Sequence, residues 1–156
     1  MPRYTLKSLL IAITLIGAWI GLLRGCYVAL THYETEENVD HVSWLPGSAS
    51  NVSYYRSYSY TAYEFDMSED EFKKWIRFDV KPITKPVDVY RYSHTTANRP
   101  DLGPNPTIAQ LEAWEAIGKA TIKNGHYHSH RRGNGGGVDV AFDRDRGRVF
   151  FQTNPR

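Results

Sequence analysis

The sequence predicts an α+β protein with an N-terminal transmembrane helix, followed by a small antiparallel sheet with one or two packed helices. Three observations predict this class. Residues 8–23 are apolar and uncharged, tyrosine-rich alternating segments begin at residue 51, and residues 68–77 carry the capping and charge pattern of a helix. The expected boundaries are a basic start and membrane anchor over 1–30, an acidic tether over 31–43 and an extracytoplasmic α+β domain over 44–156.

The N-terminal stretch has the properties of an uncleaved membrane anchor. About 20 apolar residues cross the hydrocarbon core, and the uncharged run Ser8–Leu23 reaches that length because Lys7 and Arg24 can extend their charged ends outward. Residues 1–30 contain basic residues and no acid, whereas acidic residues follow. This bias predicts a single-pass protein of the cytoplasmic membrane, with its N-terminus in the cytoplasm and its C-terminal domain outside.

Two other fates of this segment stay open. A cleaved signal peptide needs small residues just before the cleavage site, and no good pair is present. The stretch "LRGC", residues 23–26, places Leu, Gly and Cys as in a bacterial lipoprotein signal, although Arg24 stands where a small uncharged residue is usual. A lipoprotein anchored at Cys26 is therefore an alternative.

Three glycines within the stretch predict self-association. Gly17, Gly21 and Gly25 are spaced by four and so share one face of a helix. Glycines on one face let two helix backbones approach closely in lipid, which favours a homodimer. The alternative is that glycine is simply frequent in membrane helices.

The stretch "YTLKSLLIAITLIG", Tyr4 to Gly17, is similar to the opening of many short proteins of planctomycete bacteria. Those proteins begin with an aromatic residue, Ser or Thr, Leu and a basic residue, before a Leu-rich run that contains Thr-Leu. They are largely uncharacterised and look like single-pass envelope proteins. The resemblance implies a location in the bacterial cell envelope and implies no activity.

Beyond the tether, alternating patterns predict a sheet. Residues 52–60 and 63–67 place their apolar residues on opposite parities, which predicts two strands with a turn or bulge near 59–61. Residues 85–93 read as a strand entered through a proline. The C-terminal residues 138–152 predict a hairpin, with Val138, Val140 and Phe142 facing inward.

Two capping signals predict helices. Ser68 and Glu71 form a capping box, Met67 and Phe72 are spaced as a hydrophobic staple, and acids precede bases along the segment. These features are structural, so the acids at 69–71 are not interpreted as catalytic. Thr107 and Gln110 suggest a second capping box for a helix over 107–117, with Gly118 as its stop.

The segment "NGHYHSHRR", residues 124–132, holds the candidate metal ligands. Asn-Gly between alternating segments predicts a two-residue hairpin turn, which would pair Lys123 with His126. His126, His128 and His130 would then project from one face, with about 7 Å between alternate Cα atoms. Three histidines can hold a zinc ion with a water. The neighbouring sequence offers no carboxylate and adds two arginines, which favours a solvated strand face instead.

These observations favour a non-enzymatic interaction domain. The sequence contains no G-x-S-x-G motif of hydrolases, no H-E-x-x-H motif of zinc proteases, no phosphate-binding loop and no glycine pattern of dinucleotide-binding turns. It also contains no basic patch that would indicate nucleic-acid binding. The expected partners are the lipid bilayer, another envelope protein, wall polymer or a second copy, with no cofactor. The acidic first half and the basic tail could complement each other within one chain or across a dimer. The competing hypothesis is a zinc-type metalloenzyme or metal-binding protein that uses the three histidines, with His94 as a further ligand.

Overall fold

The computed structural model describes the backbone of residues 6–93 and 103–154, and it describes the side chains of these residues except 6–9, 12 and 29–31. The chain divides into two compact units, Met1–His32 and Tyr33–Arg156. The first unit contains one long helix, α1 (Leu6–Thr31). Among the residues described, none of the helices is both long enough and apolar enough to cross a membrane.

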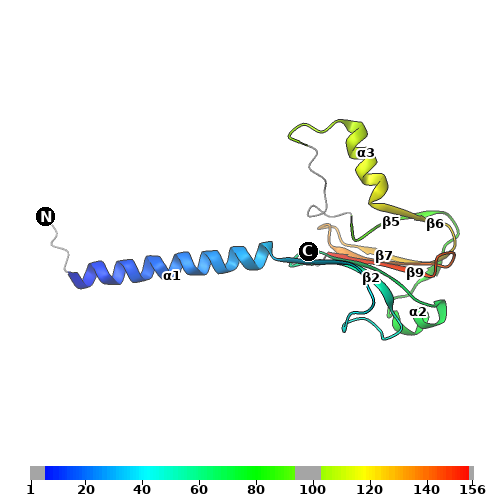
Figure 1. Cartoon of the computed structure of the whole chain (residues 1–156), viewed down its shortest axis with the longest axis horizontal. Coiled ribbons are helices and arrows are strands. Elements are labelled where there is room, and N and C mark those ends of the chain that lie inside the picture. Colours follow the sequence, from blue (N-terminus) through cyan, green and yellow to red (C-terminus); the bar gives the residue numbers. More distant parts are fainter. Residues whose placement is uncertain (1–5, 94–102, 155–156) are drawn as a thin grey trace. The chain divides into compact units, whose positions relative to one another are not determined.

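The second unit is an α+β domain with a mostly antiparallel sheet, which confirms the α+β part of the predicted class (Figure 1). The described residues form a seven-stranded sheet of order β1-β2-β3-β9-β8-β7-β4 and a two-stranded sheet of β5 and β6. The strands are β1 (Tyr33–Val39), β2 (Ser50–Ser57), β3 (Thr61–Asp66), β4 (Lys81–Pro82), β5 (Val87–Tyr90), β6 (Lys119–Ile122), β7 (Gly125–Arg131), β8 (Gly137–Asp143) and β9 (Arg148–Asn154). The helices of this unit are α2 (Glu69–Trp75) and α3 (Ile108–Ile117).

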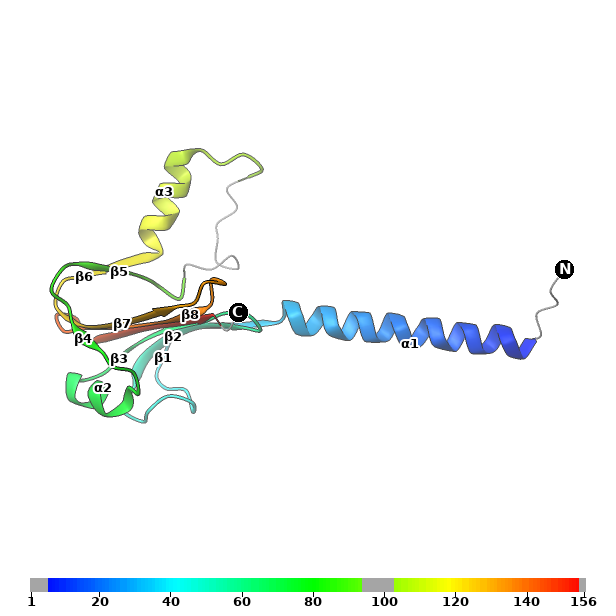
Figure 2. The ribbon, with the colours of Figure 1, turned by 180° about the vertical axis from the view of Figure 1, so that it is seen from behind.

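The two faces of the large sheet carry different covers. Helix α2 lies against one face, while β5, β6 and α3 lie on the other (Figure 2). Phe65, Phe72 and Phe142 belong to the core under α2, where Phe72 stacks on Phe142 with ring centroids 5.1 Å apart. A smaller core of Val89, Ile122, Ala141 and Phe150 joins the two sheets. Because both faces are covered, consecutive residues in the middle of β2 and β8 are buried and strict alternation is lost.

Both helices begin at the predicted N-caps, but the capping box predicted at Ser68 and Glu71 is only half formed, because the Glu71 carboxylate bonds to the Ser68 hydroxyl and not to its backbone. The Ser68 hydroxyl accepts a hydrogen bond from the Glu71 amide at 3.3 Å, and Met67 and Phe72 are both buried in the core. At α3, Thr107 and Gln110 form a complete capping box, and Gly118 is the C-cap. However, α3 buries none of its residues, and Ile108 is 75% exposed, so only α2 is packed into the core.

The prediction of an acidic tether over residues 31–43 is partly wrong. Residues 33–39 form strand β1, which pairs with β2, so the folded unit begins at Tyr33 rather than at residue 44. Tyr33 stacks on Tyr55 at 5.6 Å, and the Thr35 hydroxyl donates to the Tyr54 carbonyl at 3.0 Å. An edge strand needs few apolar residues, and charged side chains protect it from unwanted pairing, so an acidic polar sequence suits this position.

The predicted Asn124-Gly125 hairpin is also wrong. Strand β6 pairs with β5 in the small sheet, while β7 pairs with β8 and β4 in the large one, so residues 123–124 connect two layers. Gly125 has a φ of 143°, and a Cβ there would overlap the Phe142 carbonyl oxygen. The glycine is therefore required by close approach of the β8 backbone and does not form a two-residue turn.

The charge complementarity suggested by the sequence occurs within one chain. Arg148 bonds to Glu64 at 3.0 Å and to Asp66 at 2.6 Å, joining the basic tail to the acidic first half. Arg144 makes a similar connection to Glu69 at 2.6 Å. These pairs link β9 and the β8–β9 turn to β3 and α2.

Candidate functional site

Strand β7 presents the three predicted histidines in three different environments. Their side chains alternate along one face, but His126 is buried, His128 is half-buried and His130 is exposed. The expectation of a uniformly solvated face is therefore wrong at His126. The reason is α2, which packs over this end of β7 and brings Phe72 to 6.4 Å from the His126 ring.

His126 is part of an ion cluster that local sequence did not reveal. Its Nε2 lies 2.8 Å from Glu69 Oε1, so a carboxylate is present although none stands nearby in sequence. Glu69 also accepts hydrogen bonds from Arg144 Nε at 2.6 Å and Lys73 Nζ at 2.6 Å. These bonds, with that of Arg144 the largest cause, hold the pKa of Glu69 well below its usual range.

The Glu69–His126 pair resembles a carboxylate-oriented general base, but its geometry favours a structural role. With Nε2 turned to Glu69, the remaining lone pair belongs to Nδ1. Nδ1 is buried and has no hydrogen-bond partner among the described residues. A general base must come within hydrogen-bond distance of a substrate proton, directly or through one water. The buried Nδ1 is closed to both, so this pair anchors α2 to β7.

The other histidines do not complete a metal centre. His128 Nδ1 lies 3.0 Å from the Asp79 carbonyl oxygen, and its ring stacks on Phe78 at 4.9 Å. Within residues 6–93 and 103–154, no group of three or more His, Cys, Asp or Glu side chains gathers closely enough to hold a metal ion. His94, the further ligand suggested by the sequence, lies outside the described residues.

The more promising feature of β7 is its outer edge. Strand β4 pairs only with His126 and Tyr127, so the described residues provide no strand partner beyond that point. The Gly125 carbonyl faces outward, accepting from Ile83, whereas the Arg132 amide faces inward, donating to Gly136. Because backbone groups alternate along a strand, the N–H and C=O groups of Ser129 and Arg131 face outward. This free edge is positioned by β8, which pairs along all of β7.

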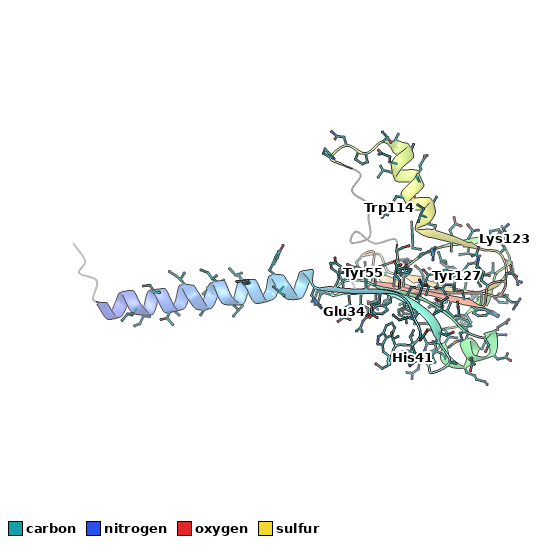
Figure 3. The ribbon with its side chains drawn as sticks, viewed as in Figure 1. Glu34, His41, Tyr55, Trp114, Lys123 and Tyr127 are labelled. Carbon is teal, nitrogen blue, oxygen red and sulfur yellow. The ribbon has the colours of Figure 1, made fainter. Side chains whose placement is uncertain are left out.

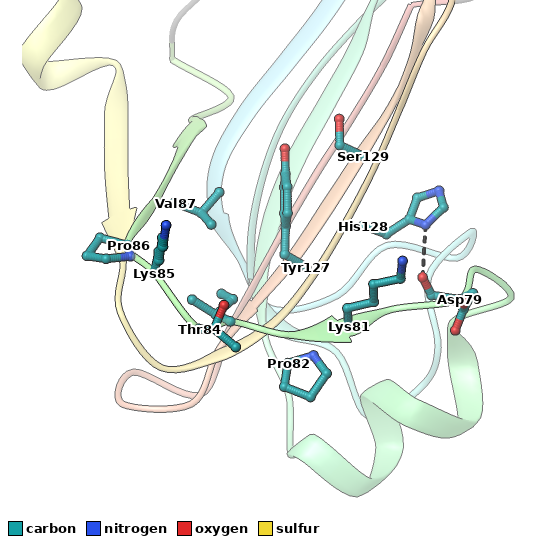
Figure 4. Close-up of a pocket in the computed structure, with 11 residues that line it drawn as sticks. Asp79, Lys81, Pro82, Thr84, Lys85, Pro86, Val87, Tyr127, His128 and Ser129 are labelled. Atoms are coloured by element: carbon teal, nitrogen blue, oxygen red, sulfur yellow. Dashed lines mark hydrogen bonds between the residues drawn. The ribbon is translucent and has the colours of Figure 1, made fainter.

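A hollow of about 500 Å³ adjoins this free edge (Figure 4). We call it the edge hollow. One wall is the β7 segment Tyr127–Ser129, and the other is the chain from Asp79 to Val87. Two prolines, Pro82 and Pro86, stiffen the second wall, because their rings fix the backbone.

The polar groups of the edge hollow favour an acidic occupant. Lys81 and Lys85 line it together with a single acid, Asp79. Tyr127 lines the hollow from β7 (Figure 4), and the Ser129 hydroxyl donates to Asp139 at 2.5 Å. Arg131, two residues further along β7, forms an ion pair with Asp139. Two lysines and one acid therefore line the edge hollow, which gives it a net positive charge.

The remaining predicted residues belong to α1. Gly17, Gly21 and Gly25 are exposed on this helix, and a Cβ at any of them would meet no atom within 4 Å. Cys26 is exposed on the same helix as a free thiol. Sequence reasoning missed the edge hollow, although the lysine- and proline-rich run "KPITKP", residues 81–86, was a usable signal for a stiff basic wall.

Comparison of the chain with protein-family models, with curated proteins and with solved structures finds no match in any of the three. The function of this chain is therefore inferred from the chemistry of its own surface.

Proposed function

We propose that this chain is a non-enzymatic binding protein of the bacterial cell envelope, which holds an extended acidic segment of a partner protein against the free edge of β7. The observation that carries the proposal is the outward-facing backbone of Ser129 and Arg131 beside the edge hollow, which has no strand partner within residues 6–93 and 103–154. An added strand would satisfy these backbone groups, as in other complexes formed by strand addition. Lys81 and Lys85 would supply charge complementarity to an acidic segment.

The proposal includes membrane anchoring through α1, with the N-terminus in the cytoplasm and the domain outside. Support comes from the uncharged run Ser8–Leu23 and from the basic residues that precede it. The described apolar side chains of α1 are also exposed, with Trp19 at 67% and Leu22 at 69%. A helix this apolar requires a cover, and lipid is the cover that the flanking charges favour.

Protease added to intact spheroplasts tests the topology. The domain should be digested without lysis, leaving the anchor in the membrane fraction. Protection of the domain until lysis, or loss of all chain from the membrane fraction, would contradict this part of the proposal.

A synthetic peptide tests the binding surface. We choose the sequence of β1, "YETEENV", because it is acidic and forms a strand in this protein. Its affinity for the full-length chain in non-ionic detergent can be measured by fluorescence polarisation. Binding should require an extended peptide. A control peptide with a proline in place of its central residue should therefore bind at least about tenfold more weakly, because the proline removes one or more hydrogen bonds to the edge of β7.

Ser129→Pro is the sharpest variant for this assay. It removes an outward N–H that no described strand uses, and proline is tolerated where the N–H of an edge strand faces solvent. We expect about tenfold weaker peptide binding with an unchanged circular dichroism spectrum. Lys85→Gln should weaken binding at low salt, whereas Lys74→Gln, on the exposed face of α2, should not. Equal affinity of Ser129→Pro and wild type would overturn the proposed edge.

A further inference from the structure

A second cavity lies between the two sheets of the domain, apart from the edge hollow. It has a volume of about 590 Å³, and we call it the interlayer cavity. Its floor is the large sheet at β3 and β9, and its wall is strand β6 with the residues that flank it. Five of its lining side chains are basic and one is acidic: Arg91, Lys119, Lys123, Arg146 and Arg148, with Glu64.

Glu64 holds two of the five cations in fixed positions. This carboxylate is 1% exposed and accepts hydrogen bonds from Arg91 Nε at 3.1 Å and Arg148 Nε at 3.0 Å. One carboxylate cannot neutralise two guanidinium groups, and each guanidinium has further N–H donors. Arg91 donates a second bond to Glu64, from Nη2 at 3.3 Å. Arg148 donates two further bonds outside the lining, to Asp66 at 2.6 Å and to the Asn51 carbonyl at 3.4 Å, so Arg91 keeps more of its N–H groups free for a ligand.

The other three cations approach from separate segments. Lys119 is bonded to Glu115 at 2.8 Å and Arg146 to Asp143 at 3.0 Å, and both acids lie outside the cavity lining. The Lys119–Glu115 pair is exposed, and such a pair contributes about 0–1 kcal/mol, so an anion in the cavity can compete for Lys119. Lys123 has no ion partner among the described residues and stands at the end of β6 (Figure 3). The cavity therefore combines pre-positioned and available positive charge.

The arrangement discriminates between classes of anion. A single carboxylate offers one charge and two oxygens in a plane, which a single arginine can satisfy. Cations on β6, β9, the segment after β5 and the β8–β9 turn converge from several directions. A phosphate group carries more charge and oxygens in a tetrahedral arrangement, which suits such converging donors better. Phe150, 4% exposed, adds an apolar part to the floor.

We infer that the interlayer cavity is a binding site for a phosphate-bearing ligand, with Arg91 and Lys123 as its principal contacts. This site is separate from the peptide surface proposed above and does not depend on it. The ligand need not be part of the partner protein, and occupancy would tie β6 to the large sheet.

Titration calorimetry of the full-length chain in non-ionic detergent, with inorganic pyrophosphate as the probe, tests this inference. At low ionic strength we expect saturable binding of one pyrophosphate per chain, weakened by added salt because the contacts are charged. Tricarballylate, a flexible carboxylate of similar charge, should bind at least about tenfold more weakly. Equal binding of the two would overturn the assignment to phosphate, and absence of saturable binding would overturn the site.

Variants locate the binding. Arg91→Gln should weaken pyrophosphate binding by about tenfold and Lys123→Gln by at least about threefold, losses of roughly 0.7–1.4 kcal/mol. Lys123 has no partner in the described part of the chain whose loss would disturb the fold, so its variant keeps the test valid if Arg91→Gln unfolds. Lys74→Gln, on the exposed face of α2 and outside both proposed sites, is the matched control and should bind as wild type does. Unchanged affinity in Lys123→Gln and in folded Arg91→Gln would show that pyrophosphate binds elsewhere.

Discussion

Replacing Glu64 by Gln should cost this domain a large part of its stability. The carboxylate is 1% exposed, and the change keeps its shape while removing its charge. Arg148, whose side chain is 14% exposed, would lose its buried partner, whereas Arg91, at 38%, could turn toward water. A hydrogen bond to a buried charged group contributes about 1.5–3 kcal/mol, and a half-exposed pair adds at most about 1 kcal/mol. We therefore expect a loss of about 3 kcal/mol in the free energy of unfolding.

Thermal unfolding followed by circular dichroism measures this loss. For a domain of this size, 1 kcal/mol corresponds to roughly 3–5 °C, so Glu64→Gln should lower Tm by about 10 °C. Asp66→Asn is the matched control, because the Asp66 side chain is 39% exposed and its replacement removes only one ion pair of the same arginine, Arg148. Its Tm should fall by no more than about 4 °C. Added salt should change the difference little, since the main pair is buried.

The double variant Glu64→Gln, Arg148→Met separates the pair from a simple packing effect. In Glu64→Gln, Arg148 keeps only the partly exposed Asp66 as an ionic partner, so removing this cation should recover part of the lost stability, because an incompletely compensated buried charge is the main cost. A Tm for Glu64→Gln within about 2 °C of wild type, or a further fall in the double variant, would refute this reasoning.

Three other predictions concern the ion cluster, the histidines and the anchor. The pKa of Glu69 is depressed in the folded protein, so Glu69 contributes to folding stability above the ordinary value of 4.5, and this contribution is lost as the pH falls below it. The urea midpoints of wild type and Glu69→Gln should therefore differ at pH 7 and converge in acid, and a difference that stays constant with pH would contradict this. Zinc should bind the full-length chain weakly and below one equivalent, because His126 and His128 already have partners. Tight, stoichiometric zinc binding that is lost in the His126→Ala, His128→Ala variant would restore the metal hypothesis. Gly21→Ile should abolish crosslinking between copies in membranes if the glycine face joins two anchors, and unchanged crosslinking would exclude that face.

What the sequence could predict follows from the range of the interactions involved. The caps at Ser68 and Thr107 involve residues three positions apart, so the sequence contains the whole interaction. The strands at 50–57 and 61–66 likewise carry their own alternation and turn. The contact between Glu69 and His126 joins residues 57 positions apart, and no local pattern predicts it.

The failures have the same origin. Asn124-Gly125 has the composition of a tight turn, but the glycine is needed where the Phe142 carbonyl approaches β7, a contact that only the folded sheet creates. The acidic segment 33–39 lacks apolar alternation because it forms an edge strand, whose polar sequence resembles a linker. The edge hollow could not be predicted because it depends on β4 pairing with only two residues of β7, and this register exists only in the folded sheet.

The most direct test of the proposed binding surface is amide hydrogen exchange at Ser129 and Arg131, measured by NMR on the full-length chain with and without the β1 peptide. Both amides face outward beyond the end of β4, so they should exchange fast in the free protein. Bound peptide should slow both amides selectively, leaving those of His128 and His130, already paired with β8, unchanged. Saturation with peptide that leaves the exchange of Ser129 and Arg131 unchanged would contradict strand addition at this edge.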